Sequence, residues 1–137
     1  EMCIRDSRQS PIIIEVTDKA VRDKLSKMNA DVMGAKIDPF YGAPVVLVVL
    51  ADKSVGTYKY DGSLVMENLM LAANAVGLGS CWIHRAKEEF ESEEGRELLR
   101  QLGISGDYEG IGHCILGYPA GDIPAEKPRK ENWVYKI

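Results

Sequence analysis

The stretch SLVMENLMLAANAV, from Ser63 to Val76, decides the fold. Beyond Ser63, only Glu67, Asn68 and Asn74 interrupt its apolar residues, so a helix over this range is apolar around almost its whole circumference. Such a helix must be buried on nearly all sides, and a chain of 137 residues has little mass with which to surround it. We therefore predict a homodimer with this helix near the interface. A central core helix in a monomer is the alternative.

The flanking segments predict alternating strands and helices. Pro44 to Leu50 (PVVLVVL) is apolar at every position, which is typical of a strand that is covered on both faces at the centre of a sheet. An acidic helix is predicted further along the chain, broken near Ser92, with its six glutamates forming a solvated face. The remaining predicted elements are a strand over 11–16, a helix over 19–29, a strand over 80–84, the acidic helix over 87–102 and a strand over 110–118.

Two segments are predicted to lack helical structure. Residues 52–62 are polar and contain two glycines, which indicates a connection. After Pro119 the chain is rich in glycine and proline, and then Trp133, Tyr135 and Ile137 alternate with their neighbours as in a terminal strand. Because it follows a long irregular segment, this strand is a candidate for pairing away from its neighbours in sequence.

Composition excludes several classes of protein. The 17 Lys and Arg residues against 21 Asp and Glu give a net charge of −4, which argues against a nucleic-acid partner. The longest apolar run, Ala43 to Ala51, is about half of the ~20 residues that a membrane-spanning helix needs, so no membrane association is expected. Three cysteines without close pairing, Cys3, Cys81 and Cys114, indicate a reducing compartment, and we predict the cytoplasm.

The beginning of the chain differs from the rest. Residues 1–8 carry four charges and no apolar signal-peptide core, and we expect a non-native or disordered leader there. Residues 9–137 are expected to form a single domain whose last part, residues 119–137, is an extended C-terminal arm.

Common nucleotide motifs do not fit the sequence. Gly77-Leu78-Gly79 begins like a dinucleotide-binding fingerprint, but the third glycine position holds Trp82, and the motif follows a predicted helix where it should follow a strand. A Rossmann site is therefore rejected. The sequence also lacks a Walker-type phosphate loop.

The cysteines and histidines do not predict a metal or nucleophile site. A zinc site could be drawn from Cys81, His84, His113 and Cys114, but the members of each pair would point to opposite faces of a strand. A Cys/His nucleophile remains open, although two of the three cysteines lie in apolar runs, where buried and unreactive thiols are usual. We favour structural cysteines, and we expect His113 to be a strand histidine with satisfied hydrogen bonds.

One basic cluster, Lys127-Pro128-Arg129-Lys130, lies in the predicted arm. A guanidinium fork, an ammonium group and a backbone held extended by proline suit phosphate recognition. Taken alone, the spacing favours a solvated basic run instead.

Four segments together resemble the FMN-dependent nitroreductase family in its short bacterial form. The helix followed by GLGSCWI is the most specific part of the resemblance, which extends from about Gln9 to the C-terminus. The segments are PVVLVVLADK at 44–53, DGSLVMENLMLAANAVGLGSCWIH at 61–84, GIGHCILGY at 110–118 and KPR at 127–129. The resemblance implies an α+β homodimer with a mainly antiparallel central sheet flanked by helices. It also implies a long central helix at the dimer interface, FMN between the subunits and a C-terminal arm that embraces the partner.

The resemblance also implies a set of cofactor-binding residues. In the family, the segment that aligns with Trp82 to Arg85 lies along the isoalloxazine ring. This gives Trp82 and Ile83 a ring-packing role and gives the main-chain N–H of His84 or Arg85 a place near flavin N5. A basic pair that aligns with Lys127 and Arg129 holds the FMN phosphate. The full implied set is Gln9, Ser10, Trp82, Ile83, His84, Arg85, Lys127 and Arg129.

One departure from the family pattern concerns the N-terminus. Family members open with a helix whose Arg-Ser-x-Arg type motif grips the phosphate, and a loop ending in Asn-x-Gln-Pro follows. This chain enters only at Arg8-Gln9-Ser10-Pro11, so Gln9 is expected to be the remnant of that loop. Loss of two arginine contacts, each worth ~1.5–3 kcal/mol, is expected to weaken FMN binding strongly.

The activity that the resemblance implies is a ping-pong reduction. NAD(P)H gives a hydride to FMN N5 and departs, and an electron-poor nitroaromatic or quinone acceptor takes its place. No side-chain acid or base is required. The alternatives are a relative that reduces something specialised, such as a carbon–halogen bond, a non-catalytic flavin-binding dimer, and a cofactor-free fragment of the family.

Overall fold

A computed structural model describes residues 8–121 and 125–137. Most of the expected leader over residues 1–8, and Cys3 with it, lies outside the described residues. The elements, in chain order, are β1 (Pro11–Val16), α1 (Lys19–Met33), β2 (Val45–Asp52), α2 (Tyr58–Ala75), β3 (Gly79–Ile83), α3 (Ala86–Glu91), α4 (Glu93–Gln101) and β4 (Tyr108–Gly117).

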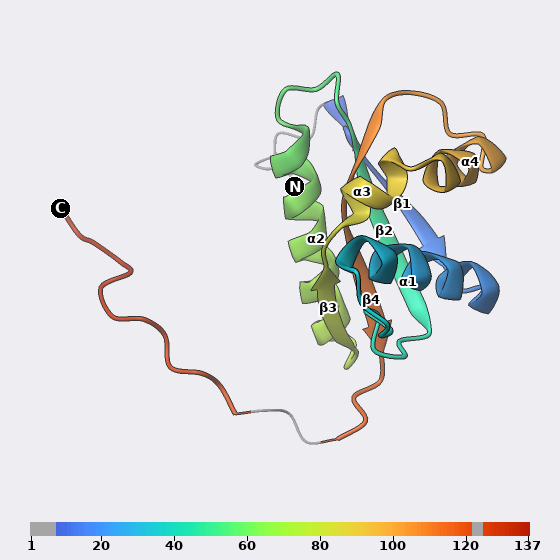
Figure 1. Ribbon diagram of the computed structural model, residues 1–137. Coiled ribbons are helices and arrows are strands. Elements are labelled where there is room, and N and C mark those ends of the chain that lie inside the picture. The colour runs from blue at the N-terminus through green and yellow to red at the C-terminus, as the bar shows by residue number, and fades with distance from the viewer. Residues whose placement is uncertain (1–7, 122–124) are drawn as a thin grey trace.

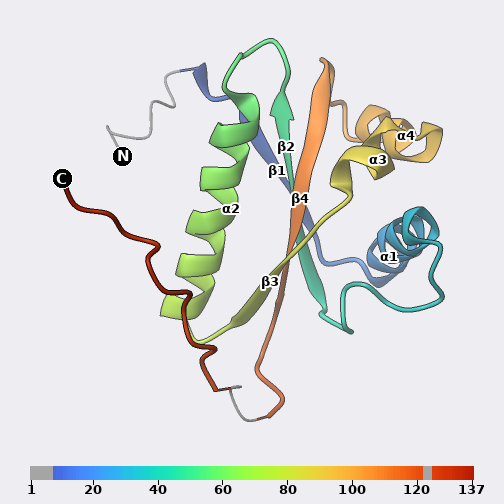
Figure 2. The same cartoon turned by 60° about the vertical axis from the view of Figure 1, so that its left-hand side comes forward.

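The four strands form one antiparallel sheet in the order β1-β2-β4-β3. Helix α2 covers one face of this sheet, and α1, α3 and α4 cover the other (Figures 1 and 2). Strands β1 and β3 therefore lie at opposite edges of the sheet. Among the described helices, none has the length and apolar character needed to cross a membrane.

Strand β2 confirms the prediction of a central strand that is covered on both faces. Val46, Val48 and Leu50 are fully buried among residues of α1 and α3, whereas Val49 and Ala51 are fully buried in a second core beneath α2. Alternate residues of a strand point to opposite faces. The unbroken apolar run of β2 therefore supplies both cores at once.

Helix α2 begins at Tyr58, so the prediction of a connection over residues 52–62 is wrong for its last five positions. The reason is the role of Gly62, one of the two glycines that indicated a connection. Gly62 is buried inside α2, and a methyl group at its Cα would lie 2.5 Å from Ile111 Cγ1 in β4. This glycine therefore serves the close approach of helix and sheet, which sequence composition does not distinguish from a turn.

The outer side of α2 is open within one chain. Only Gly62, Met66 and Ala73 of this helix are buried, while Leu64 and Leu71 are 47% and 59% exposed. The apolar residues that predicted burial on nearly all sides are thus covered by this chain on one side only.

The C-terminal arm extends away from the layers of the fold (Figure 1). The terminal strand predicted around Trp133 to Ile137 is not formed, and the described part of residues 119–137 contains no helix or strand. A strand requires backbone partners. Trp133 and Tyr135 are instead exposed.

Candidate cofactor-binding site

The junction between β3 and α3 carries four of the residues that the sequence singled out, Trp82 to Arg85. Trp82 lies opposite Cys114 in the β3–β4 ladder and is partly exposed. Its indole packs against Gly112, where a methyl group would lie 2.5 Å from Trp82 Nε1. The glycine at position 112 therefore makes room for the Trp82 ring on the α2 side of the sheet.

Ile83 points to the opposite face of the sheet. Its side chain is only 8% exposed and packs in the core beneath α1 and α3. The Ile83 side chain therefore has little exposed surface with which to pack against a flavin ring. Only the main chain of Ile83 can take part in the junction.

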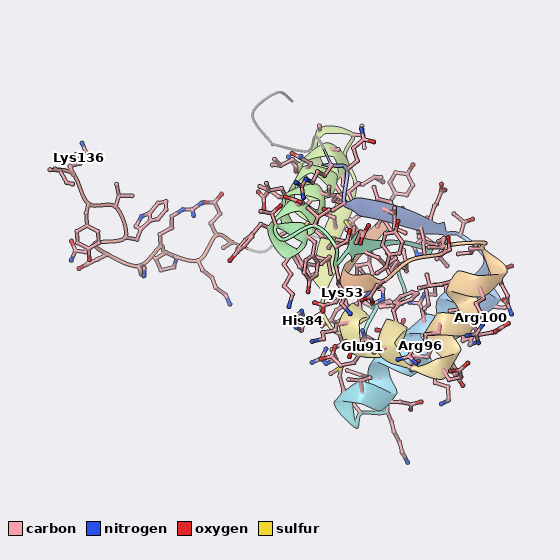
Figure 3. All side chains as sticks on the ribbon, turned by 90° about the horizontal axis from the view of Figure 1, so that it is seen from above. Lys53, His84, Glu91, Arg96, Arg100 and Lys136 are labelled. Atoms are coloured by element: carbon pink, nitrogen blue, oxygen red, sulfur yellow. The ribbon has the colours of Figure 1, made fainter. Side chains whose placement is uncertain are left out.

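His84 and Arg85 form the turn into α3. The side chain of His84 is exposed, and Figure 3 shows it on the outside of the body. The His84 carbonyl points inward, where it accepts a hydrogen bond from Asn29 Nδ2 at 2.7 Å. Arg85 has a left-handed backbone with φ = 77°, which costs a non-glycine residue about 1–2 kcal/mol.

The N–H of Arg85 is an open hydrogen-bond donor. The described residues place no acceptor on it. In a trans peptide the C=O and N–H groups point in opposite directions, and the chain has no cis peptide among its described residues. Because the His84 carbonyl points at Asn29, the Arg85 N–H points away from the core.

A buried polar cluster lies behind this junction, formed by Asn29, Glu89 and His113. Asn29 Nδ2 also donates to Glu89 Oε1 at 2.5 Å, and His113 Nε2 lies 3.2 Å from Glu89 Oε2. Both side chains of the Glu89–His113 pair are fully buried. Glu89 thus contradicts the prediction that all six glutamates of this region form a solvated face, because it lies on the side of α3 that packs against the core.

His113 lies in a strand as the sequence predicted, but the prediction that its hydrogen bonds are satisfied is wrong, because neither ring nitrogen has a partner among the described residues. Asn29 Oδ1 and Glu89 Oε2 are also buried without a hydrogen-bond partner among the described residues, so the approach of Glu89 Oε2 to His113 Nε2 is a close polar contact and not a hydrogen bond. The sequence did not single out Asn29 or Glu89 as site residues. The only available signal was polar residues within apolar helical spacing, which many exposed positions share.

Gln9 and Ser10 lie at the other edge of the sheet. Gln9 is exposed, whereas Ser10 is buried, and its hydroxyl donates to Asp61 Oδ2 at 2.8 Å near the start of α2. Because β1 and β3 are the opposite edges of the sheet, one chain does not bring these two residues together with Trp82 to Arg85.

Lys127 and Arg129 lie on the extended arm and are exposed. The Arg129 guanidinium lies 5.7 Å from the ring centre of Trp133, also in the arm. Figure 3 shows how far the arm carries Lys136 from His84. Within one chain, the predicted phosphate contacts are therefore not gathered at the β3–α3 junction.

The two described cysteines differ. Cys114 is buried, and burial together with the nearby Cys81 raises the pKa of its thiol to about 11. Cys81 is exposed. The expectation of buried thiols is thus confirmed for Cys114 and wrong for Cys81. No three His, Cys, Asp or Glu side chains within the described ranges are grouped to hold a metal ion.

Comparison with known proteins gives consistent matches. The sequence model of the protein family named "Nitroreductase family" matches residues 7–118 of this chain. A curated protein of Archaeoglobus fulgidus, named "Putative NADH dehydrogenase/NAD(P)H nitroreductase", is 33% identical over 103 residues. That match covers 72% of this chain and 56% of the relative, so the chain corresponds to little more than half of the relative's length.

Solved structures share the fold. A nitroreductase with bound FMN from Bacteroides fragilis matches with a TM-score of 0.84 and 21% identity, over 96% of this chain and 78% of that one. A second FMN-bound nitroreductase, from Desulfitobacterium hafniense, matches with a TM-score of 0.79 and 22% identity, over 95% and 77% of the two chains. These similarities confirm the predicted α+β fold, with an antiparallel sheet flanked by helices.

Proposed function

This chain belongs to the nitroreductase family, and on that premise we propose that it is one subunit of a dimeric FMN-dependent NAD(P)H oxidoreductase. The proposed acceptors are electron-poor nitroaromatic or quinone compounds. The observation that carries the proposal is the open N–H of Arg85, a main-chain donor that points away from the core at the edge of the sheet. FMN is bound in the two solved structures described above.

The β3–α3 junction suits the isoalloxazine end of FMN. Trp82 offers a partly exposed aromatic ring beside this junction, and Arg85 offers the N–H. The sequence left open whether His84 or Arg85 gives the donor near flavin N5. Because the His84 carbonyl is held inside by Asn29, we assign the donor to the Arg85 N–H.

The phosphate end of the site is proposed to be completed by assembly. Lys127 and Arg129 are exposed cations on an arm that leaves its own body. A second copy would cover the exposed apolar side of α2, including Leu64 and Leu71, and would offer the arm a surface to cross. Charged hydrogen bonds from both arm residues to the phosphate would each contribute ~1.5–3 kcal/mol.

The chain's own residues would bind and orient the reactants. Bound FMN would supply hydride chemistry at N5. The Arg85 N–H would face that atom, and NAD(P)H and the acceptor are proposed to occupy the space over the ring in turn. No side chain of the junction is required as an acid or a base, which suits an exposed His84 and a core-facing Ile83.

An FMN titration followed by anaerobic reduction tests this proposal. The purified protein should quench the fluorescence of added FMN, and NADH or NADPH should then bleach the bound flavin. Bleaching that reverses on adding a quinone or nitroaromatic compound is the expected result. Binding without bleaching would indicate a non-catalytic flavin-binding dimer, and a protein that binds no FMN would overturn the proposal.

A further inference from the structure

The buried cluster of Asn29, Glu89 and His113 is unusual for its surroundings. The three side chains come from α1, α3 and β4 and are exposed by 0%, 1% and 0%, within a core of apolar residues. Burying polar groups in an apolar core is unfavourable unless hydrogen bonds compensate, and apolar side chains of similar volume are often at least as stable there. Packing alone therefore does not explain these three residue types.

We propose that the cluster is a positioning device for the His84–Arg85 peptide. It fixes the His84 carbonyl inward and so holds the Arg85 N–H outward, toward the flavin ring. This inference rests on the proposed function, because the flavin is the group that the N–H would meet. Asn29, Glu89 and His113 are positioning residues in this account and touch no reactant.

The amide of Asn29 has only one orientation that suits its neighbours. Its Nδ2 carries two hydrogens, and its two acceptors are the His84 carbonyl at 2.7 Å and Glu89 Oε1 at 2.5 Å. The reverse orientation would set Oδ1 against the His84 carbonyl oxygen, which cannot donate. Glu89 therefore locks the amide that in turn holds the His84 carbonyl.

Glu89 also holds the other side of Arg85. Its main-chain N–H donates to the Arg85 carbonyl at 3.1 Å, which forms the first turn of α3. The peptide groups before and after Arg85 are thus both tied to Glu89, one through Asn29 and one directly. This double attachment accounts for a left-handed backbone at a residue that is not glycine.

His113 completes the cluster from the sheet. Its Nε2 lies 3.2 Å from Glu89 Oε2, the oxygen that does not meet Asn29, and its ring lies 5.1 Å from that of Phe40, centre to centre. His113 also pairs with Ile83 in the β3–β4 ladder. The cluster therefore packs against the central sheet as well as α3, through this close polar contact and the Ile83–His113 strand pair, although no hydrogen bond joins Glu89 Oε2 to His113 Nε2.

The test compares three variants with wild type. Asn29→Ala removes the donor to the His84 carbonyl. Glu89→Gln keeps an oxygen for Asn29 and serves as the conservative rescue. Leu25→Val, fully buried one turn earlier in α1, is the control for a general loss of packing. If Asn29→Ala does not fold, Asn29→Ser replaces it, because serine keeps a polar group but is too short to reach His84.

Two readouts separate positioning from stability. The first is NMR of the cofactor-free protein, in which the intraresidue HN–Hα contact of Arg85 reports its positive φ. The second is the FMN dissociation constant. Asn29→Ala should lose the positive φ and weaken FMN binding by about tenfold or more. Glu89→Gln and Leu25→Val should retain both properties.

Each result decides a separate point. If Asn29→Ala keeps the positive φ of Arg85, or if Leu25→Val weakens FMN binding as much as Asn29→Ala does, the positioning proposal is overturned. If wild type binds no FMN, the proposed function is overturned, while the NMR readout still shows whether the cluster fixes the peptide.

Discussion

The β3–α3 junction and the C-terminal arm would form the two ends of the same flavin site, yet only the junction is fixed by contacts with the core of its own subunit. At the junction, Asn29 and Glu89 fix the orientation of a single peptide from inside the core. In the arm, Arg129 lies over Trp133 of the same segment, and both residues are exposed. The junction end of the proposed site is therefore ordered within one subunit, and we propose that the other end forms only on assembly.

The largest effect is expected from a substitution that blocks assembly at α2. Leu71→Glu should raise the dissociation constant of the proposed dimer by about a thousandfold, because an unpaired carboxylate buried at an interface costs several kcal/mol. Analytical ultracentrifugation measures this, and FMN binding should fall with it. Leu102→Glu is the matched control, since Leu102 is similarly exposed (57% against 59%) but follows α4 on the other side of the sheet. Equal behaviour of the two variants would remove α2 from the interface.

The arm should contribute to FMN binding without contributing to the stability of the folded chain. The double variant Lys127→Ala, Arg129→Ala should weaken FMN binding by about 100-fold or more, because two charged hydrogen bonds to the phosphate are lost. Its urea-unfolding midpoint should equal that of wild type, since both residues are exposed. Lys136→Ala removes a charge from the same arm and should bind FMN normally. An unchanged titration of the double variant would exclude the arm from the site.

The junction should show the opposite behaviour, with stability and binding lost together. A methyl group at Gly110 would lie 2.2 Å from the Ala86 carbonyl oxygen at the start of α3. Gly110→Ala should therefore lower the free energy of unfolding by about 2–3 kcal/mol, measured by urea denaturation. Gly56→Ala is the control, because nothing lies within 4 Å of the added methyl group. A stable Gly110→Ala variant would mean that α3 can shift at little cost.

The smallest expected effect is on the pH dependence of the free energy of unfolding, through the carboxylate of Asp38. Burial raises the pKa of Asp38, but donors led by Arg22 and Ser26 outweigh it and hold this pKa well below its usual value. The stabilisation is therefore complete above the usual pKa of about 4 and is lost as the pH falls below it. Asp38→Asn should cost about 1 kcal/mol at neutral pH, with allowance for partial exposure of the carboxylate.

Unfolding measured between about pH 2 and 7 checks this sign. The difference between Asp38→Asn and wild type should shrink toward the acid end. Asp31→Asn is the control, because within residues 8–121 and 125–137 the Asp31 carboxylate pairs only with the exposed Lys27. A difference that stays constant with pH would show that the Asp38 charge contributes nothing to folding.

Much of the fold could be predicted because its signals are local. The apolar run from Pro44 to Leu50 predicts a central strand, and β2 confirms it, since the residues from Val46 to Ala51 alternate between two cores. The break near Ser92 was also correct, because the Ser92 hydroxyl accepts from the Gly95 N–H and caps α4. The start of α2 was not predicted, because a glycine that allows close packing, such as Gly62, and a glycine in a connection look alike in sequence.

The candidate site could be predicted only in part. The segment Trp82 to Arg85 was found by its resemblance to a family, but the role of each side chain was not. Ile83 faces the core, and the Ser10 hydroxyl donates to Asp61. A resemblance in sequence does not reveal either contact. Nothing in the sequence separated Glu89 from the five other glutamates around it.

By itself the sequence determined the four strands of the sheet and the approximate ranges of the helices, because hydrophobic spacing and helix caps act between residues a few positions apart. Only the tertiary structure decided that Asn29 meets Glu89, 60 residues away, and the His84 carbonyl, 55 residues away. A buried hydrogen bond depends on which side chains the packed layers bring into contact, and that contact has no periodicity along the chain.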